Sequence, residues 1–364
     1  MAVRSLFPIM IWPWNEKKIV SAAAPEQKSA RIDDGDVLVT ALPDPMLLLD
    51  SHGNIIRANA NAQEILEASV IGLHISQAIR APAVLEAITH GKAAQVDYEV
   101  RGARARHFEV HIAPLAHALE NGGVLLLVLK DLTREQQIER MRSDFVANAS
   151  HELRTPLASL SGFIDTLQGA ARADEKARDS FLNLMREQAE RMKRLIDDLL
   201  SLSRIEMNAH LLPSAKVDLA DVAGHVGDSL QSMAKAENIT IKLDVTKPLV
   251  VTGDRDELVQ VVLNLVENAI KYSNPNSHVR IVGKQEANRI SLSVIDQGRG
   301  IAEEHIPRLT ERFYRISVQE SRSRGGTGLG LAIVKHILMR HRGRLVVTSE
   351  VGQGSNFTVQ LPVS

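Results

Sequence analysis

Two long stretches with helical apolar periodicity dominate the middle of the chain. In the first, Ile138, Met141, Phe145 and Ala149 recur at intervals of three and four residues along one helical face. A break at residues 169–174 separates it from a second stripe. The second stripe consists of Phe181, Met185, Met192, Leu195, Leu199 and Leu202. Two helices with a short connection form an antiparallel hairpin. Its apolar surface exceeds what two helices cover for each other, so we expect a homodimer with a four-helix bundle.

A smaller α+β domain is predicted on the N-terminal side of the hairpin, at about residues 32–131. Strand-like runs lie at 45–50, 55–59, 94–100, 107–115 and 123–129, and a helix is expected at 60–66. This layout, with the hairpin from Leu49 to Ile55 and its turn at Ser51-His52-Gly53-Asn54, resembles a PAS domain, a common sensory module. The aromatic residues Tyr98 and Phe108 are expected in the core, and no residue pattern supports a bound haem or flavin.

The C-terminal part alternates helices and strands. Expected helices lie at 218–237, 254–272 and 329–341, and expected strands at 239–245, 249–252, 279–284, 290–296, 345–349 and 355–360. This order fits helices on one face of a mixed sheet, an α/β sandwich. The predicted fold class is therefore multidomain α+β. The expected parts are an N-terminal apolar segment and linker (1–31), the PAS-like domain (32–131), the hairpin (132–207), a linker (208–217) and the α/β sandwich (218–364).

Charge and cysteine content restrict the partners and the compartment. With 43 basic and 44 acidic residues the net charge is −1, so the chain has no general electrostatic attraction for nucleic acid. The absence of cysteine excludes disulfides and thiolate metal sites, and it fits a reducing compartment. Histidines other than His151 show no metal-ligand spacing. We therefore expect a cytoplasmic protein that does not bind nucleic acid directly.

An apolar run at residues 6–14 holds both tryptophans of the chain. A transmembrane helix takes about 20 apolar residues, so this run with its two prolines is too short to span a bilayer. Two interpretations stay open. The tryptophans could anchor the chain peripherally to the inner face of the plasma membrane or to a membrane protein, or the run could be a hydrophobic tail.

Three polar residues converge on one face of the expected helix at 254–272. Asn264, Asn268 and Lys271 are spaced i, i+4 and i+7, opposite the buried leucines. Amide and ammonium groups there can hold a hard cation and the phosphates that it neutralises, since Mg²⁺ prefers few protein oxygens together with phosphate oxygens and water. Taken alone, the pattern would indicate an ordinary solvated helix face.

Two glycine clusters change that interpretation. Asp296 ends an apolar strand and begins the first cluster, at 296–301, and the second cluster, at 325–331, opens a helix. Glycine permits close backbone approach, and a helix N-terminus offers unpaired N–H groups to phosphate. The Asp296 carboxylate can accept a hydrogen bond from an exocyclic amine, which would select adenine. No Gly-Lys-Ser or Gly-Lys-Thr follows the glycines, so the site is not a Walker A loop.

These strings resemble the N box and the two glycine boxes of the ATP-binding domain shared by histidine kinases, gyrase, heat-shock-90 chaperones and MutL-type repair ATPases. Residues 311–315 match the F box of histidine kinases. The resemblance implies that Asn268 holds Mg²⁺ with support from Asn264, that Lys271, Tyr272 and the lid residue Arg315 contact phosphates, and that Asp296 reads adenine. Further implied nucleotide-binding residues are Gly298 and Gly300 at the base pocket, and Gly326, Thr327, Gly328, Leu329 and Gly330 around the triphosphate.

The string from Ser150 to Leu157 is similar to the H box of sensor histidine kinases of two-component systems. The resemblance implies that His151 attacks the γ-phosphate of ATP while Glu152 stabilises the imidazolium that develops. It gives Thr155 a role in placing water for dephosphorylation of a response regulator. A hydroxyl bond back to the helix carbonyls is the structural alternative for Thr155, and both can hold. Pro156 is expected to kink the helix just past the site.

We therefore expect an ATP-dependent protein-histidine kinase that transfers the phosphoryl group from His151 to an aspartate of a response regulator. Placement of the PAS-like domain directly before the H box favours the phosphate-regulon sensor kinases, and thus phosphate-starvation sensing. One alternative is a related ATPase that acts as a conformational clamp, against which the H and F boxes argue. Another is a degenerate kinase that only binds partners, against which the intact Asn268, Asp296 and glycines argue.

Overall fold

The computed structural model describes residues 42–363 apart from 67–68, 101–104, 120–121, 170–171, 173, 246–247, 287 and 318–325. The chain divides into two compact units, Met1–Glu139 and Arg140–Ser364. The tryptophan-bearing run at 6–14, and the predictions made for it, lie outside the described residues. Among the helices that are described, none combines the length and the apolarity needed to cross a lipid bilayer.

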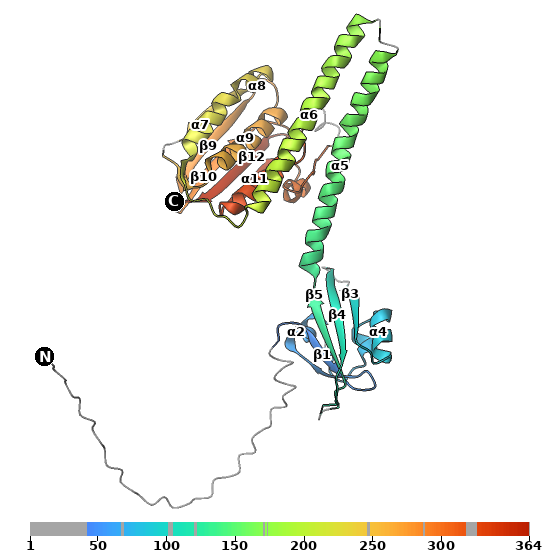
Figure 1. Ribbon diagram of the computed structural model, residues 1–364. Helices are drawn as coiled ribbons and strands as arrows, with labels where there is room; N and C mark the ends of the chain where they lie inside the picture. Colours follow the sequence, from blue (N-terminus) through green and yellow to red (C-terminus); the bar gives the residue numbers. More distant parts are fainter. Residues whose placement is uncertain are drawn as a thin grey trace, which may run out of the picture. The chain divides into compact units, whose positions relative to one another are not determined.

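The first unit is built on one antiparallel five-stranded sheet with the order β2-β1-β5-β4-β3 (Figure 1). The strands are β1 (Met46–Leu49), β2 (Ile55–Ala58), β3 (Ala94–Val100), β4 (Arg106–Pro114) and β5 (Leu125–Asp131). The helices are α2 (Ala60–Ile65), α3 (Ile75–Ala78) and α4 (Pro82–Thr89), of which only α2 was predicted. Phe108 is 2% exposed within the core of this unit, and Tyr98 packs against that core.

The turn that carries the PAS resemblance is fixed by Asp50. Its Oδ1 atom accepts hydrogen bonds from the backbone N–H groups of His52 and Asn54, each at 2.8 Å. Gly53 has a φ of +82°, a conformation that a residue with a Cβ atom adopts at a cost. An aspartate that bonds the backbone two residues on is a common turn former, so this local sequence sets the pairing of β1 with β2.

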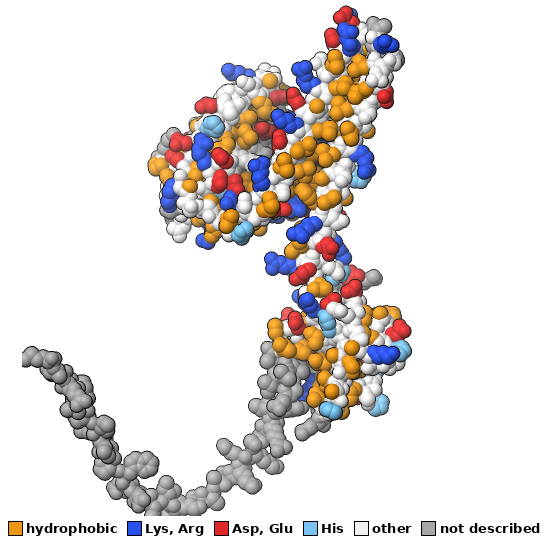
Figure 2. Space-filling view, in the orientation of Figure 1, with side chains coloured by type: hydrophobic (Ala, Val, Ile, Leu, Met, Phe, Trp, Pro, Cys, Tyr) orange, Lys and Arg blue, Asp and Glu red, His pale blue; other side chains and the backbone are white. Residues whose placement is uncertain are grey.

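The expected helical hairpin is formed by α5 (Thr133–Gln168) and α6 (Glu175–Met207), and the second unit begins within α5. Asp174 caps α6 by accepting a hydrogen bond from the N–H of Ala177 at 2.9 Å. Helix α5 continues through Pro156, whose missing N–H leaves one helical hydrogen bond unmade. Figure 2 shows apolar side chains gathered along the hairpin. Exposed members are Met141, Val146, Leu157, Ile164, Leu182, Leu184, Ile196, Leu200 and Met207.

The C-terminal part is an α/β sandwich around a five-stranded sheet with the order β11-β12-β10-β9-β7. Its strands are β7 (Thr240–Val245), β9 (His278–Glu286), β10 (Arg289–Ile295), β11 (Arg344–Glu350) and β12 (Gly354–Pro362). Only the β7–β9 pair is parallel among the described pairings of this sheet. The predicted strand at 249–252 forms β8 (Val250–Thr252), which pairs with the unpredicted β6 (Lys216–Asp218) outside the large sheet.

The helices of this sandwich are α7 (Leu219–Ser229), α8 (Gln231–Ala236), α9 (Arg255–Tyr272) and α11 (Gly330–Arg340), with a short 3₁₀ helix at Glu303–Arg308. The single helix expected at 218–237 is interrupted at Leu230, which ends α7 and precedes α8. Helix α9 starts at Asp254, whose Oδ1 accepts from the N–H groups of Asp256 and Glu257. Its apolar side is buried at Leu258, Val261, Val262, Leu265, Val266, Ala269 and Ile270, which leaves the polar side for a site.

Candidate functional site

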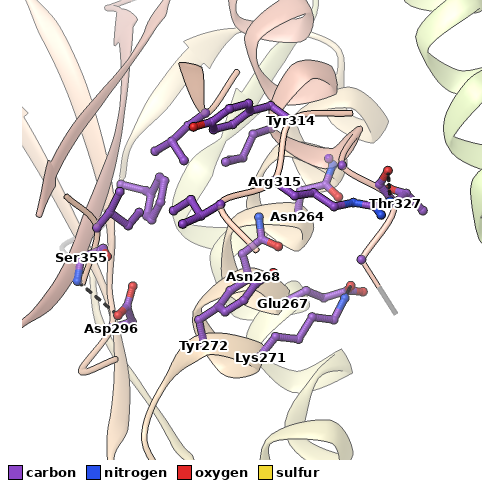
Figure 3. Close-up of a pocket in the computed structure, with 18 of the residues that line it drawn as sticks. Asn264, Glu267, Asn268, Lys271, Tyr272, Asp296, Tyr314, Arg315, Thr327 and Ser355 are labelled. Atoms are coloured by element: carbon purple, nitrogen blue, oxygen red, sulfur yellow. Dashed lines mark hydrogen bonds and ion pairs between the residues drawn. The ribbon is translucent and has the colours of Figure 1, made fainter. Parts of the chain in front are cut away.

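A cavity of about 300 Å³ adjoins the polar side of α9 (Figure 3). The structure brings eleven of the residues singled out in the sequence to its lining. They are Asn264, Asn268, Lys271, Tyr272, Asp296, Gly300, Arg315, Gly326, Thr327, Gly328 and Gly330. Gly298 and Leu329 are neighbours of these residues in the chain but do not line the cavity, and neither do His151, Glu152 and Thr155 of α5. A cavity of this size is typical of a small-molecule site, and charged and amide side chains make up much of its lining.

The polar side of α9 presents Asn264, Asn268 and Lys271 together, as their spacing predicts. The Nζ atom of Lys271 lies 2.9 Å from Oε2 of Glu267, a cavity residue that the sequence reasoning missed although it lies inside the same string. The Nδ2 atom of Asn264 is buried and has no hydrogen-bond partner. Since a buried donor without a partner costs free energy, this amide is suited to receive an acceptor from a bound molecule.

Asp296 follows β10 and is 5% exposed. Its Oδ1 atom accepts a hydrogen bond from the N–H of Gly298 at 2.9 Å. It accepts a second from the N–H of Ser355 at 3.1 Å (Figure 3). Burial raises the pKa of the Asp296 carboxyl, and these two backbone hydrogen bonds oppose the rise. Both hydrogen bonds formed by described residues fall on one oxygen, so Oδ2 is the natural acceptor for a ligand in the cavity.

Glycine is required where the backbone approaches Asp296 from two sides. A Cβ atom at Gly298 would lie 2.2 Å from the carbonyl oxygen of Tyr272, and one at Gly300 would lie 2.0 Å from the carbonyl oxygen of Glu350. Gly300 also has a φ of +71°. These two glycines therefore shape the cavity wall by letting neighbouring chain segments approach closely.

The second glycine cluster connects the cavity to the N-terminus of α11. The carbonyl oxygen of Gly328 accepts a hydrogen bond from the N–H of Phe313 at 2.8 Å. The hydroxyl of Thr327 accepts from the N–H of Leu329 at 3.2 Å, and Leu329 is fully buried under the loop. Gly330 begins the helix, so the partial positive charge of the N-terminal N–H groups lies at the cavity.

Arg315 reaches the cavity from the segment that precedes the second glycine cluster, and only 4% of its side chain is exposed. Its Nη2 atom donates to the carbonyl oxygen of Thr327 at 2.6 Å and to Oε2 of Glu152 at 3.1 Å. Its Nε atom is buried without a hydrogen-bond partner. Together with Asn264, Arg315 thus supplies a second unsatisfied donor at the cavity, a combination that suits an anionic ligand such as phosphate.

Helix α6 forms part of the cavity wall, which the sequence did not predict. Arg194, Asp197 and Asp198 line the cavity from this helix. The hydroxyl of Thr327 donates to Oδ2 of Asp198 at 2.6 Å. Burial raises the pKa of Asp198, and the hydrogen bond from Thr327 opposes the rise. No sequence signal distinguishes Asp198 from other acidic residues of an amphipathic helix, because its role depends on how the helix packs against the loop.

His151 lies on the exposed surface of α5 and does not line the cavity. The neighbouring Glu152 forms ion pairs with Arg191 at 2.9 Å and Arg315 at 3.1 Å. The hydroxyl of Thr155 donates to the carbonyl oxygen of His151 at 3.2 Å, the back-bond expected of threonine in a helix. The structure therefore connects Glu152 to the cavity through Arg315, while His151 is an exposed residue of the same helix.

Comparisons with known proteins match both the hairpin and the part of the chain that holds the cavity. Residues 253–364 match the family "Histidine kinase-, DNA gyrase B-, and HSP90-like ATPase", and residues 141–208 match the "His Kinase A (phospho-acceptor) domain". The chain is 36% identical over 333 residues to the phosphate regulon sensor protein PhoR of Pseudomonas aeruginosa, which covers 90% of this chain and 74% of PhoR.

Two further relatives cover a smaller part of the chain. The sensor protein kinase WalK of Staphylococcus aureus is 38% identical over 240 residues, which is 65% of this chain and 57% of WalK. The solved structure of the Acinetobacter baumannii histidine kinase AdeS is 28% identical with a TM-score of 0.47, and the match covers 59% of this chain and 98% of AdeS.

The chain belongs to the sensor histidine kinases. It is a protein-histidine kinase, an ATP-binding transferase of a two-component system, the class in which a phosphoryl group passes from the kinase to a response regulator. The predictions of kinase class, of ATP as ligand and of an N-terminal antiparallel sheet domain, a helical hairpin and an α/β sandwich are confirmed. The clamp ATPase alternative is excluded by the match to the phospho-acceptor domain.

Proposed function

We propose that His151 is the phosphoacceptor and that ATP binds in the cavity beside α9. The observation that carries this proposal is the convergence of Asn264, Asn268, Lys271 and Arg315 on one cavity that also holds Asp296. Donors and cations gather at one part of the lining, and the buried carboxylate of Asp296 lies apart from them (Figure 3). A ligand with an adenine at one end and phosphates at the other satisfies both.

The cavity residues bind different parts of ATP, according to their chemistry. Asp296 Oδ2 accepts a hydrogen bond from the exocyclic amine of adenine, and Gly298 and Gly300 give the base its space. Lys271, Tyr272 and Arg315 contact phosphates, and the loop from Gly326 to Gly330 wraps the triphosphate. Positioning and neutralisation of charge contribute most of the catalysis in such a phosphoryl transfer.

The orphaned amide of Asn264 beside Asn268 fits a hydrated Mg²⁺–phosphate group, because Mg²⁺ takes few protein oxygens and keeps phosphate and water ligands. Asn268 would hold the ion and Asn264 would support its water or phosphate ligands. When bound, Mg²⁺ neutralises the charge of the phosphate oxygens. Glu267 is paired with Lys271 and orients that lysine.

On the hairpin, one ring nitrogen of His151 attacks the γ-phosphorus of ATP while the bond to the β–γ bridging oxygen breaks and ADP leaves, and Glu152 accepts a hydrogen bond from the other ring nitrogen. Because His151 does not line the cavity of its own chain, the attack requires either a rearrangement of hairpin and sandwich or the nucleotide of a partner subunit. The phosphoryl group then passes to an aspartate of a response regulator. Thr155, one turn from His151, places the water that hydrolyses the phosphoryl group of that regulator.

The decisive experiment compares the wild-type chain with His151→Ala and with His225→Ala, a histidine of α7 outside the cavity lining. With γ-labelled ATP we expect acid-labile labelling of the wild type and of the His225 variant, and none of the His151 variant. ATP binding by the His151 variant is expected to stay within about twofold of the wild type. Labelling that persists without His151 would reject the phosphoacceptor assignment.

A homodimer is the expected assembly, since apolar side chains such as Leu157, Leu182, Ile196 and Leu200 on the hairpin lie 43–55% exposed in the single chain. A second copy covers them in a four-helix bundle. Analytical ultracentrifugation of the full-length chain is expected to give the mass of a dimer. A monomer at micromolar concentration would contradict this.

The signal is proposed to be phosphate limitation. The match to PhoR extends into the first unit, whereas the match to WalK covers only 65% of the chain.

The proposed boundaries are those of the sequence prediction, with the PAS-like domain at 32–131, the hairpin at 132–207 and the ATP-binding sandwich at 218–364. A cytoplasmic location, with peripheral membrane attachment through residues 6–14, completes the proposal. The proposed signal, phosphate limitation, is tested by deletion of the gene. Deletion should abolish induction of phosphate-uptake genes in low-phosphate medium, and unchanged induction would exclude phosphate limitation as the signal.

A further inference from the structure

Asp198 is the residue through which helix α6 touches the second glycine cluster. Its Oδ2 atom accepts the hydroxyl hydrogen bond of Thr327 at 2.6 Å, and the same hydroxyl accepts from the N–H of Leu329 at the start of α11. One carboxylate on the hairpin thus holds the loop that opens the helix. Asp198 and the neighbouring Asp197 both line the cavity.

Charged side chains of both signs surround Asp198. The carboxylate is mostly buried, Glu267 and Asp197 lie near enough to oppose its ionisation, and Lys271 lies near enough to favour it. Glu152, the second hairpin carboxylate at this border, binds the guanidinium of Arg315. Two groups suited to binding phosphate, the Thr327 hydroxyl and the Arg315 guanidinium, are therefore each held by a carboxylate of the hairpin.

We propose that Asp198 is a positioning residue that lowers the affinity of the cavity for ATP. Its carboxylate accepts the hydrogen bond that the Thr327 hydroxyl would otherwise donate to a phosphate, and its negative charge repels the triphosphate. ATP must therefore displace the hairpin from the glycine-rich loop. This inference rests on the proposed phosphate-binding roles of Thr327 and Arg315. Removal of the charge at Asp198, with its shape kept, then strengthens binding in proportion to the phosphate charge of the ligand.

The test uses the full-length chain with Asp198→Asn, which is close to isosteric and can still accept from Thr327. Asp179→Asn is the matched control, because Asp179 is an exposed aspartate of the same helix outside the cavity lining. Affinities for adenosine, ADP and a non-hydrolysable ATP analogue are measured by calorimetry. We expect Asp198→Asn to bind the ATP analogue about tenfold more tightly, ADP with a smaller gain and adenosine unchanged. Asp179→Asn should match the wild type for all three.

Each other result overturns the inference. Equal affinities of wild type and Asp198→Asn for the ATP analogue would show that the charge is irrelevant. Weaker binding would show that the carboxylate assists the nucleotide or its cation. An equal gain for adenosine would show that the cavity merely opens, without an effect of phosphate charge. If Asp198→Asn melts lower than wild type, Asp198→Ser is measured in the same way. These affinities are independent of His151 labelling, so failure here leaves the phosphoacceptor assignment standing.

Discussion

Arg315 and Glu152 are joined by a hydrogen bond of 3.1 Å, although 163 residues separate them in the chain. Arg315 comes from the segment before the second glycine cluster, and Glu152 follows the phosphoacceptor candidate His151. The same guanidinium also donates to the carbonyl of Thr327. The arginine is thus bound to a glutamate of the hairpin, and in the proposed function it exchanges this partner for the phosphates of the nucleotide.

Replacement of this arginine tests its part in the reaction. Arg315→Ala is expected to lower the rate of autophosphorylation by about 100-fold, because a cation that neutralises transition-state charge is lost. Arg344→Ala is the control, since Arg344 is exposed on β11 and bonds Gln360 away from the cavity. Initial rates of labelling from γ-labelled ATP check the prediction. A wild-type rate in Arg315→Ala would remove Arg315 from the phosphate site.

Asn268 is expected to control the response to magnesium. Asn268→Ala should lower labelling at millimolar Mg²⁺ by about 10- to 100-fold, since one ligand of the ion is removed. Asn288→Ala, at an exposed turn between β9 and β10, serves as the control. A Mg²⁺ titration of the labelling rate makes the comparison. If both variants titrate like the wild type, Asn268 does not hold the ion.

Asp296→Asn is expected to affect binding and stability in opposite directions. The amide presents a donor to the adenine amine at a place that needs an acceptor, so ATP affinity should fall by about 10- to 100-fold. Stability should rise, because burial raises the pKa of this carboxyl and the charged form at pH 7 therefore costs free energy in the folded state. An increase of about 2 °C in Tm is expected.

The same experiment has a matched control in Asp244→Asn, an exposed aspartate of β7 that pairs with Arg280. This variant should change neither ATP affinity nor Tm appreciably. Calorimetric binding and thermal melting at pH 7 provide both numbers for each variant. A loss of both affinity and stability in Asp296→Asn would mean that the carboxylate serves the fold rather than the ligand.

His341 predicts a pH dependence of stability. Its side chain is fully buried, Nε2 accepts from the N–H of Asp254 at 2.9 Å, and Nδ1 donates to the carbonyl of Ile337 at 2.8 Å. Burial lowers its pKa, and the hydrogen bond to Ile337 opposes the decrease. The folded state therefore keeps the ring neutral, while the unfolded chain takes up a proton below about pH 6.5. Stability should decrease as the pH falls from 7 towards 5.

His341→Gln should flatten this decrease, because glutamine can accept from Asp254 without titrating. His210→Gln, which alters an exposed histidine, should retain the wild-type slope. Urea unfolding at several pH values between 5 and 8 measures the slopes. Equal slopes for all three proteins would assign the pH dependence to other groups, such as His336, whose pKa burial also lowers.

Much of the fold follows from local periodicity in the sequence. The stripes of α5 and α6, the strand-like runs of β3 and β4, and the helical pattern at 254–272 each predict their element within a few residues. The break at Leu230 was not predictable, since neither glycine nor proline stands there and the interruption depends on packing. The short helices α3 and α4 were missed because few residues contribute to each pattern.

The site shows the same division between local and tertiary information. Asn264, Asn268 and Lys271 could be grouped because one helix carries them, and the glycines because close backbone approach requires them. Asp198 and the pairing of Arg315 with Glu152 depend on contacts between elements far apart in the sequence. A single sequence carries no signal for such contacts, so the wall that α6 adds to the cavity came only from the structure.

Phe313, in the lid segment, has an unfavourable backbone conformation. Its φ is +64°, which is unfavourable for a residue with a side chain by about 1–2 kcal/mol. The N–H of Phe313 is bonded to Gly328, and its ring lies 5.9 Å from that of Phe145 on α5. The ring contact places a hairpin side chain against the left-handed residue of the lid segment. A substitution at Phe145 therefore acts on the packing of the lid as well as on the hairpin.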